Sequence, residues 1–122
     1  MAKILIVDDA SFMRGTLKFI CEKADHEVVG LAKDGKEALR LYEKYKPDIV
    51  TLDVLMEGAD GLWALEAIIS KYPTATIIMV TALGQEDKEK KARELGAKGY
   101  IKKPFKHTQI VDEIERVLLK GK

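Results

Sequence analysis

Acidic, hydroxyl and basic side chains follow four of the apolar runs in this sequence, at the points where predicted strands end. Asp8 and Asp9 follow the first run, Asp53 closes the third, and Thr81 and Lys103 follow the fourth and fifth. Because the carboxyl ends of parallel strands meet at one edge of a sheet, we expect these side chains to converge. Three close carboxylates repel one another, and a hard divalent cation such as Mg²⁺ relieves that repulsion. With a hydroxyl and an ammonium group beside it, the cluster predicts phosphoryl chemistry.

The elements that must position these groups alternate along the chain. Continuous aliphatic and β-branched runs, such as residues 49–52, indicate strands buried on both faces of a parallel sheet, and the segments between them have helical periodicity. We expect an α/β fold, a doubly wound, flavodoxin-like five-stranded parallel sheet of strand order 2-1-3-4-5 with helices on both faces. The predicted strands are 3–7, 26–32, 47–53, 75–80 and 98–102, and the predicted helices are 10–23, 34–46, 60–72, 85–95 and 107–119.

The composition is that of one globular domain. A chain of 122 residues has room for one core, so we expect a single domain spanning 1–122. The net charge of +1 gives no reason to expect direct nucleic-acid binding. Without a charged leader or an apolar run of membrane-spanning length, we expect a cytoplasmic monomer that does not enter a membrane. The lone cysteine, Cys21, lies on the apolar side of a predicted helix and is expected to be a buried thiol.

The predicted helix 85–95 differs from the others in being almost entirely charged. Its apolar content is little more than Ala92 and Leu95, so its support comes largely from pairs such as Glu89 with Arg93 and Glu86 with Lys90. Gly96 is expected to end it as a C-cap. We therefore expect the most loosely held helix of the fold here.

Five short motifs at strand ends, in this order, resemble the receiver domain of two-component response regulators over essentially the whole chain. They are Ile6-Val7-Asp8-Asp9, Leu52-Asp53, Asp60-Gly61, Thr81-Ala82 and Lys103-Pro104-Phe105. Two further stretches look more narrowly like the CheY group of chemotaxis regulators, including thermophilic bacterial and archaeal members. These stretches are Ser11-Phe12-Met13-Arg14 and Ala82-Leu83-Gly84-Gln85.

The resemblance implies a role for each residue of the cluster. Asp53 would take a phosphoryl group from the phosphohistidine of a CheA-like histidine kinase, or from a small phosphodonor, and so be the phosphorylation site. Lys103 would pair with Asp53 and then with a phosphoryl oxygen, and Thr81 would donate to another such oxygen. The implied Mg²⁺ ligands are Asp8, Asp9, Asp53 and the backbone carbonyl of Leu55.

The resemblance also implies a switch rather than a turnover enzyme acting on an external substrate. Displacement of Thr81 would open space that Tyr100 fills, changing the surface formed by helix 85–95, the last strand and the last helix. That surface would bind a downstream protein target, such as a motor switch or another effector, and a phosphatase is a further expected partner. The identities of kinase and target stay open.

Three positions near Asp53 are expected to affect its chemistry, either because they depart from the usual family pattern or because they influence the rate of dephosphorylation. Glu57 stands where most receivers have a proline, which adds negative charge, so we expect weaker Mg²⁺ binding than with proline. Leu55 and Leu83 occupy places that influence hydrolysis of the acyl phosphate in the family. Neither side chain can orient water, so we expect slow autodephosphorylation.

Three other functions were weighed against this one. The first is a receiver domain excised from a larger DNA-binding or enzymatic regulator, which the lack of a linker tail disfavours mildly. The second is an aspartate-nucleophile phosphatase, which would carry a second aspartate where this chain has Leu55. The third is a flavin carrier, in which the acids at 8–9 would repel the cofactor phosphate.

Overall fold

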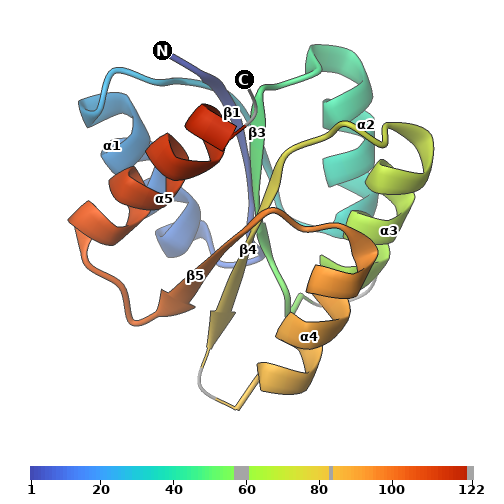
Figure 1. Cartoon of the computed structure of the whole chain (residues 1–122). Helices are drawn as coiled ribbons and strands as arrows, with labels where there is room; N and C mark the ends of the chain where they lie inside the picture. Colours follow the sequence, from blue (N-terminus) through green and yellow to red (C-terminus); the bar gives the residue numbers. More distant parts are fainter. Residues whose placement is uncertain (57–60, 83, 121–122) are drawn as a thin grey trace.

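Five strands alternate with five helices in the part of the chain that the structure describes (Figure 1). The structure is a computed structural model that describes residues 1–56, 61–82 and 84–120, and residue 120 is described by its backbone alone. In chain order the elements are β1 (Lys3–Val7), α1 (Ser11–Lys23), β2 (Glu27–Ala32), α2 (Gly35–Tyr45), β3 (Ile49–Asp53), α3 (Gly61–Lys71), β4 (Ile77–Ala82), α4 (Glu86–Leu95), β5 (Gly99–Lys103) and α5 (His107–Lys120).

The strands form one parallel sheet in the order β2-β1-β3-β4-β5, which confirms the predicted flavodoxin-like winding. The chain leaves β1 for the edge strand β2 and then returns to β3 on the other side of β1. Helices α1 and α5 cover one face of the sheet, and α2, α3 and α4 cover the other (Figure 1). Strands β1 and β3 therefore flank the point where the winding reverses, which is where open α/β sheets place their sites.

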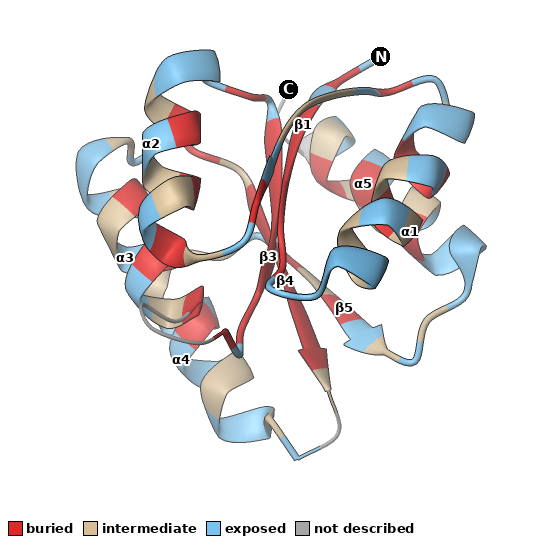
Figure 2. Ribbon diagram, turned by 180° about the vertical axis from the view of Figure 1, so that it is seen from behind, coloured by how far each residue is buried: buried red, intermediate tan, exposed pale blue. Residues whose placement is uncertain are grey.

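The core divides into two clusters, one on each face of the sheet. One joins the sheet to α2, α3 and α4, and the other joins it to α1 and α5. Figure 2 shows the central strands in red, buried between the two helix layers. Each fully buried aliphatic side chain contributes about 1.5–3 kcal/mol, so the sheet is a rigid platform for what its ends carry. Cys21 belongs to this core, and burial raises the pKa of its thiol to about 12.

The ends of several elements refine the sequence prediction. Asp34 caps α2 by accepting a hydrogen bond from the amide of Glu37 at 2.8 Å. Strand β5 is displaced by one residue from the predicted 98–102, so Lys103 is its last residue. Asp60 and Glu57 lie outside the described residues, as does Leu83.

Helix α4 is weakly anchored, as the charge pattern predicts. Across its ten residues, all of which are described, Ala92 is the one buried side chain. The predicted pair of Glu89 with Arg93 is present at 3.4 Å, whereas Glu86 accepts a hydrogen bond from the amide of Gly84 at 3.0 Å. Gly96 ends the helix in the left-handed conformation (φ 109°), as expected.

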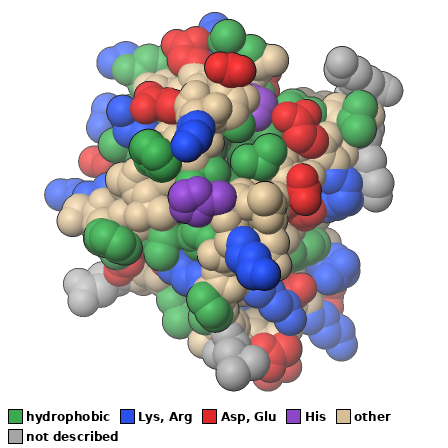
Figure 3. Space-filling view, turned by 90° about the vertical axis from the view of Figure 1, so that its left-hand side faces the viewer, with side chains coloured by type: hydrophobic (Ala, Val, Ile, Leu, Met, Phe, Trp, Pro, Cys, Tyr) green, Lys and Arg blue, Asp and Glu red, His purple; other side chains and the backbone are tan. Residues whose placement is uncertain are grey.

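The outer surface shows no strong bias of charge on the face formed by α1 and α5. Figure 3 shows acidic, basic and hydrophobic side chains interspersed there. Across the described residues, none of the helices is both long enough and apolar enough to span a membrane.

Helix α3 begins in close contact with the backbone at the end of β3. A Cβ atom on Gly61 would lie 2.0 Å from the carbonyl oxygen of Asp53 and 2.7 Å from Cα of Val54. The amide of Gly61 donates to the carbonyl oxygen of Val54 at 3.3 Å. Glycine at this position therefore allows α3 to pack directly against the strand end that carries Asp53.

Replacing Gly61 with alanine should lower the free energy of unfolding by about 1–3 kcal/mol, since backbone atoms cannot move aside for the added methyl group. Chemical denaturation measures the change. Gly15→Ala is the matched control, because a Cβ there meets no atom within 4 Å on an exposed face of α1. That control should gain about 0.5–1 kcal/mol from helix propensity. Equal stabilities for the two variants would contradict the proposed close packing.

Candidate functional site

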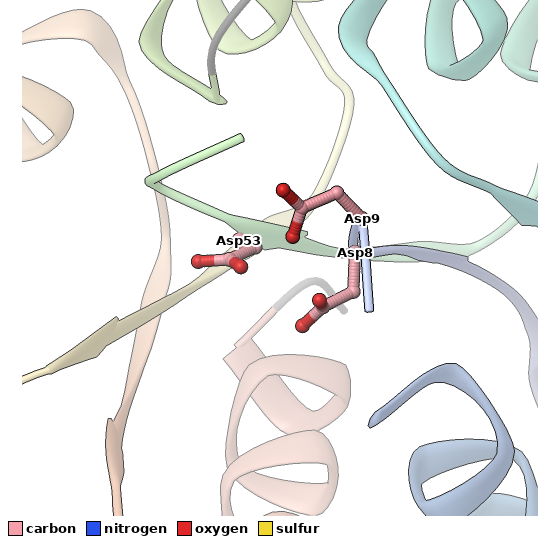
Figure 4. A group of neighbouring side chains, drawn as sticks. All are labelled: Asp8, Asp9 and Asp53. Atoms are coloured by element: carbon pink, nitrogen blue, oxygen red, sulfur yellow. The ribbon is translucent and has the colours of Figure 1, made fainter. Parts of the chain in front are cut away.

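Three carboxylates meet at the carboxyl edge of the sheet, where β1 and β3 end side by side. Val7 pairs with Leu52 in the sheet, so the residues that follow them, Asp8 and Asp53, are neighbours. One oxygen atom from each of Asp8, Asp9 and Asp53 lies within 4.8 Å of the other two, and Figure 4 shows the three carboxylates turned toward a common space. Asp8 is 1% exposed and Asp53 is 7% exposed, while Asp9 is open to solvent.

Lys103 brings a positive charge into this cluster from the end of β5. Its Nζ lies 3.5 Å from Oδ2 of Asp8 and 3.5 Å from Oδ2 of Asp53. The Lys103–Pro104 peptide bond is cis. The preceding Lys102 instead lies 3.8 Å from a carboxylate oxygen of Glu89 on α4, so the two adjacent lysines serve different surfaces.

The surroundings of Asp53 disfavour its negative charge. Burial raises the pKa of Asp53 most, and the nearby charge of Asp8 raises it further. Lys103, the amide of Leu55 that donates to Oδ1 at 3.2 Å, and the charge of Asp9 make smaller contributions, the first two lowering the pKa. The result is a pKa of about 6 for Asp53. One lysine therefore leaves the cluster short of positive charge.

Asp8 is fixed at every polar atom. Its amide donates to the carbonyl oxygen of Ala32 at 3.0 Å, and its Oδ1 accepts from the amide of Ala10 at 2.9 Å. Its Oδ2 faces Lys103, and its carbonyl oxygen accepts a hydrogen bond from Nη1 of Arg14 at 2.7 Å.

The sequence patterns gave Arg14 no role at the strand end, and so this contact was not predicted. Side chains of a helix point back toward its N-terminus, so a long residue in the first turns can reach the strand end before it. The N-terminal direction of helix side chains was therefore the signal that could have predicted the contact between Arg14 and Asp8.

Thr81 and Tyr100 lie next to the carboxylate cluster rather than within it. The hydroxyl of Thr81 is buried and has no hydrogen-bond partner among the described residues. Tyr100 is half-buried and packs against the hydrophobic core on the α4 side of the sheet. Its hydroxyl donates to the carbonyl oxygen of Ala97 at 3.2 Å. The guanidinium of Arg93 on α4 stacks 4.5 Å from the centre of the Tyr100 ring. The tyrosine is thus held at the surface by α4.

The donor set fits a hard divalent cation. All the side-chain donors are carboxylate oxygens, and two of the three carboxylates, those of Asp8 and Asp53, are buried. One oxygen from each lies close enough to the other two for all three to bind a single cation. The buried Thr81 hydroxyl, which has no partner among the described residues, could donate a hydrogen bond to an oxygen-rich group bound beside the carboxylates. Leu55, two residues after Asp53, borders the site, since its amide donates to Oδ1 of Asp53, and the residue is 46% exposed.

Comparisons with known proteins agree on one family. The family profile described as the response regulator receiver domain matches residues 4–115. The chemotaxis protein CheY of Listeria monocytogenes is 47% identical over 116 residues, which are 95% of this chain and 98% of that protein. The protein-glutamate methylesterase/protein-glutamine glutaminase of Pyrococcus abyssi is 48% identical over 105 residues, 84% of this chain but 28% of that protein. A chain in the crystal structure of the CheX–CheY–BeF3–Mg²⁺ complex of Borrelia burgdorferi has a TM-score of 0.91 and 34% identity, covering 95% of this chain and 88% of that chain.

Replacing Asp53 with asparagine should stabilise the metal-free protein at neutral pH. The folded-state pKa of about 6 lies above the ordinary value of 3.8, so the folded state binds the proton more tightly than the unfolded state. The wild type therefore loses stability as the pH rises from about 4 to about 6, and the variant should exceed it by about 1–3 kcal/mol at pH 7.

Urea unfolding in the presence of a chelator, from pH 4 to pH 8, measures this difference. It should shrink steadily as the pH is lowered and vanish near pH 4. Asp112→Asn, at an exposed site on α5, should show no such pH dependence. If the stability of Asp53→Asn exceeded that of the wild type by the same amount at every pH, the carboxylate charge would not be the cause of the difference.

Proposed function

This chain belongs to the family of response regulator receiver domains, and we propose that it accepts a phosphoryl group on Asp53 and acts as a switch in chemotaxis-type signalling. We assign the whole chain, residues 1–122, to this one domain. The observation that carries the assignment is the Asp53 carboxylate itself. It ends the central strand β3, is nearly buried, and faces one lysine and two further acids.

In the proposed reaction, a carboxylate oxygen of Asp53 attacks the phosphorus atom of a phosphohistidine on a CheA-like histidine kinase, or of a small phosphodonor. An oxygen–phosphorus bond forms, the bond between phosphorus and the donor atom breaks, and the departing group keeps that electron pair. Lys103 holds Asp53 before the transfer and then pairs with a phosphoryl oxygen. The free hydroxyl of Thr81 donates to another phosphoryl oxygen.

Asp8, Asp9, Asp53 and the backbone carbonyl of Leu55 would hold the Mg²⁺ ion. When bound, Mg²⁺ supplies the positive charge that offsets the charge of the transferring phosphoryl group. The raised pKa of Asp53 supports this assignment, since Lys103 is shared between Asp8 and Asp53 and a third carboxylate lies beside them. The same arrangement makes the chain a catalyst of its own modification and of its later dephosphorylation.

We propose that Thr81 and Tyr100 pass the change at Asp53 to the surface. Met79 pairs with Tyr100, and Thr81 follows Met79 by two residues, so alternation along the strands places Thr81 and Tyr100 on the same face of the sheet. That is the face covered by α4. Movement of Thr81 toward a phosphoryl oxygen would vacate space beside Tyr100, and Tyr100 would leave the Arg93 guanidinium to fill it.

The surface formed by α4, β5 and α5 is the proposed binding site for a downstream protein target, a motor switch or another effector. A similar chain occurs in a CheX–CheY complex, which supports binding of a second protein, and we propose a phosphatase among the partners. We propose that the chain acts as a monomer.

A second candidate function is that of a receiver domain within a larger regulator. The specific observation in its favour is the methylesterase relative, of which the matched residues make up 28%. The length of the natural protein, measured by mass spectrometry of material from its source, separates the two candidates.

Incubation with acetyl phosphate or phosphoramidate and Mg²⁺ should add one phosphoryl group, seen by intact-protein mass spectrometry. Asp53→Asn should gain none, because its amide is not a nucleophile, whereas Asp112→Asn should be modified like the wild type. A chelator should abolish the reaction. An unmodified wild type, or a modified Asp53→Asn variant, would refute the assignment.

The same samples test the proposed switch. Hydrogen exchange at β5 and α4 should rise on phosphorylation of the wild type, since Tyr100 leaves the Arg93 contact. It should stay unchanged in phosphorylated Thr81→Val, which keeps the shape of the side chain but removes the hydroxyl. Identical exchange changes in both proteins would remove Thr81 from the pathway.

Leu55→Asn should shorten the lifetime of the phosphorylated protein several-fold, because an amide beside Asp53 can orient the attacking water and an exposed leucine cannot. Loss of phosphate after removal of the donor gives the rate. Leu119→Asn, at an exposed position far along α5, is the matched control. Equal rates for Leu55→Asn and the wild type would show that this position does not limit hydrolysis. Leu83 is the second proposed rate-tuning position and lies outside the described residues.

A further inference from the structure

We propose that Arg14 is a positioning residue of the phosphoryl site, which holds the Asp8–Asp9 peptide in the orientation that aims the Asp9 carboxylate at the cation. The inference rests on the proposed function of the site and adds a residue from α1 to it. The contact that carries it is the hydrogen bond from Nη1 of Arg14 to the carbonyl oxygen of Asp8 at 2.7 Å.

The Asp8 carbonyl lies where the sheet no longer holds the chain. Strand β1 ends at Val7 and α1 begins at Ser11, so Asp8, Asp9 and Ala10 form the turn between them. The last hydrogen bond between β1 and β2 runs from the Asp8 amide to the carbonyl oxygen of Ala32. The carbonyl of Asp8 itself lies beyond this bond. Holding that carbonyl fixes the plane of the peptide that leads into Asp9.

Arg14 holds both ends of this turn. Its own amide donates to the carbonyl oxygen of Ala10 at 3.0 Å, and its side chain reaches back to the carbonyl of Asp8. Ala10 is the N-cap residue of α1 and makes no side-chain capping bond. The Arg14 guanidinium therefore supplies a tie between helix and strand end that a capping side chain does not provide here.

Asp9 is the site residue on which this tie acts directly, because it follows the peptide whose carbonyl Arg14 holds. Its side chain is exposed, whereas those of Asp8 and Asp53 are buried. The direction of an exposed carboxylate follows from its backbone more than from packing around it. Removing a residue that does not bind the metal but orients one of its ligands typically weakens metal affinity by about 10–100-fold.

Charge and position predict opposite effects of removing Arg14. A permanent positive charge near three carboxylates repels a divalent cation, so its loss would strengthen Mg²⁺ binding if charge were its whole influence. If Arg14 positions Asp9, its loss weakens Mg²⁺ binding instead. The sign of the change therefore separates the two roles.

The test is a calorimetric Mg²⁺ titration of the unphosphorylated full chain. Arg14→Met, which keeps the aliphatic stem, should bind Mg²⁺ about tenfold more weakly than the wild type, and Arg14→Lys should fall between them. Lys18→Met, one turn further along α1 where the lysine pairs with Glu22 at 3.2 Å, should bind like the wild type. Without metal, hydrogen exchange at the amides of Asp9 and Ala10 should be faster in Arg14→Met.

Arg14→Met binding Mg²⁺ as tightly as the wild type, or more tightly, would overturn the inference. If Arg14→Met does not fold, Arg14→Lys decides: it keeps the charge but loses the planar fork, so weaker binding supports positioning and unchanged binding overturns it. A wild type that binds no Mg²⁺ would refute the proposed cation site itself. Failure of that site is thus distinguishable from failure of the Arg14 role.

Discussion

Three carboxylates, two of them buried, lie together at the edge of the sheet, and their mutual repulsion must be offset by cations. The winding of the sheet imposes this arrangement, because β1 and β3 are neighbours and both end in acid. Lys103 supplies one positive charge, which leaves the pKa of Asp53 raised to about 6. A site short of positive charge attracts a divalent cation.

The same strands separate the chemistry from its readout. Side chains alternate between the two faces of a strand, so Val80, which pairs with Asp53, packs toward α1 and α5, while Met79 packs toward α4. Thr81 therefore belongs with the face that carries Tyr100, although it adjoins the residue paired with Asp53. Val80 and Thr81, adjacent at the end of β4, thus face opposite sides of the sheet.

The sequence was sufficient to predict the sheet and the position of Asp53 at a strand end. Continuous apolar runs mark the strands, and the acids stand where those runs stop. Contacts made by long side chains between elements were harder to predict. No role at the site was predicted for Arg14, which reaches Asp8, and Glu86 was expected to pair with Lys90 but accepts a hydrogen bond from the amide of Gly84. Each such side chain has several partners within reach, and helical spacing does not decide among them.

Helix α4 is held more weakly than the rest of the fold. Its core contacts are the buried Ala92 and the partly buried Leu95. Its polar contacts include Arg93 with Tyr100, Arg93 with Glu89, and Glu89 with Lys102. Exposed contacts of these kinds contribute up to about 1 kcal/mol each. Since about 1.4 kcal/mol changes a population tenfold, losing the Arg93–Tyr100 contact alone is enough to shift α4 measurably. The buried strands beside it are held by contacts several times stronger, so such a shift stays at the surface of the molecule.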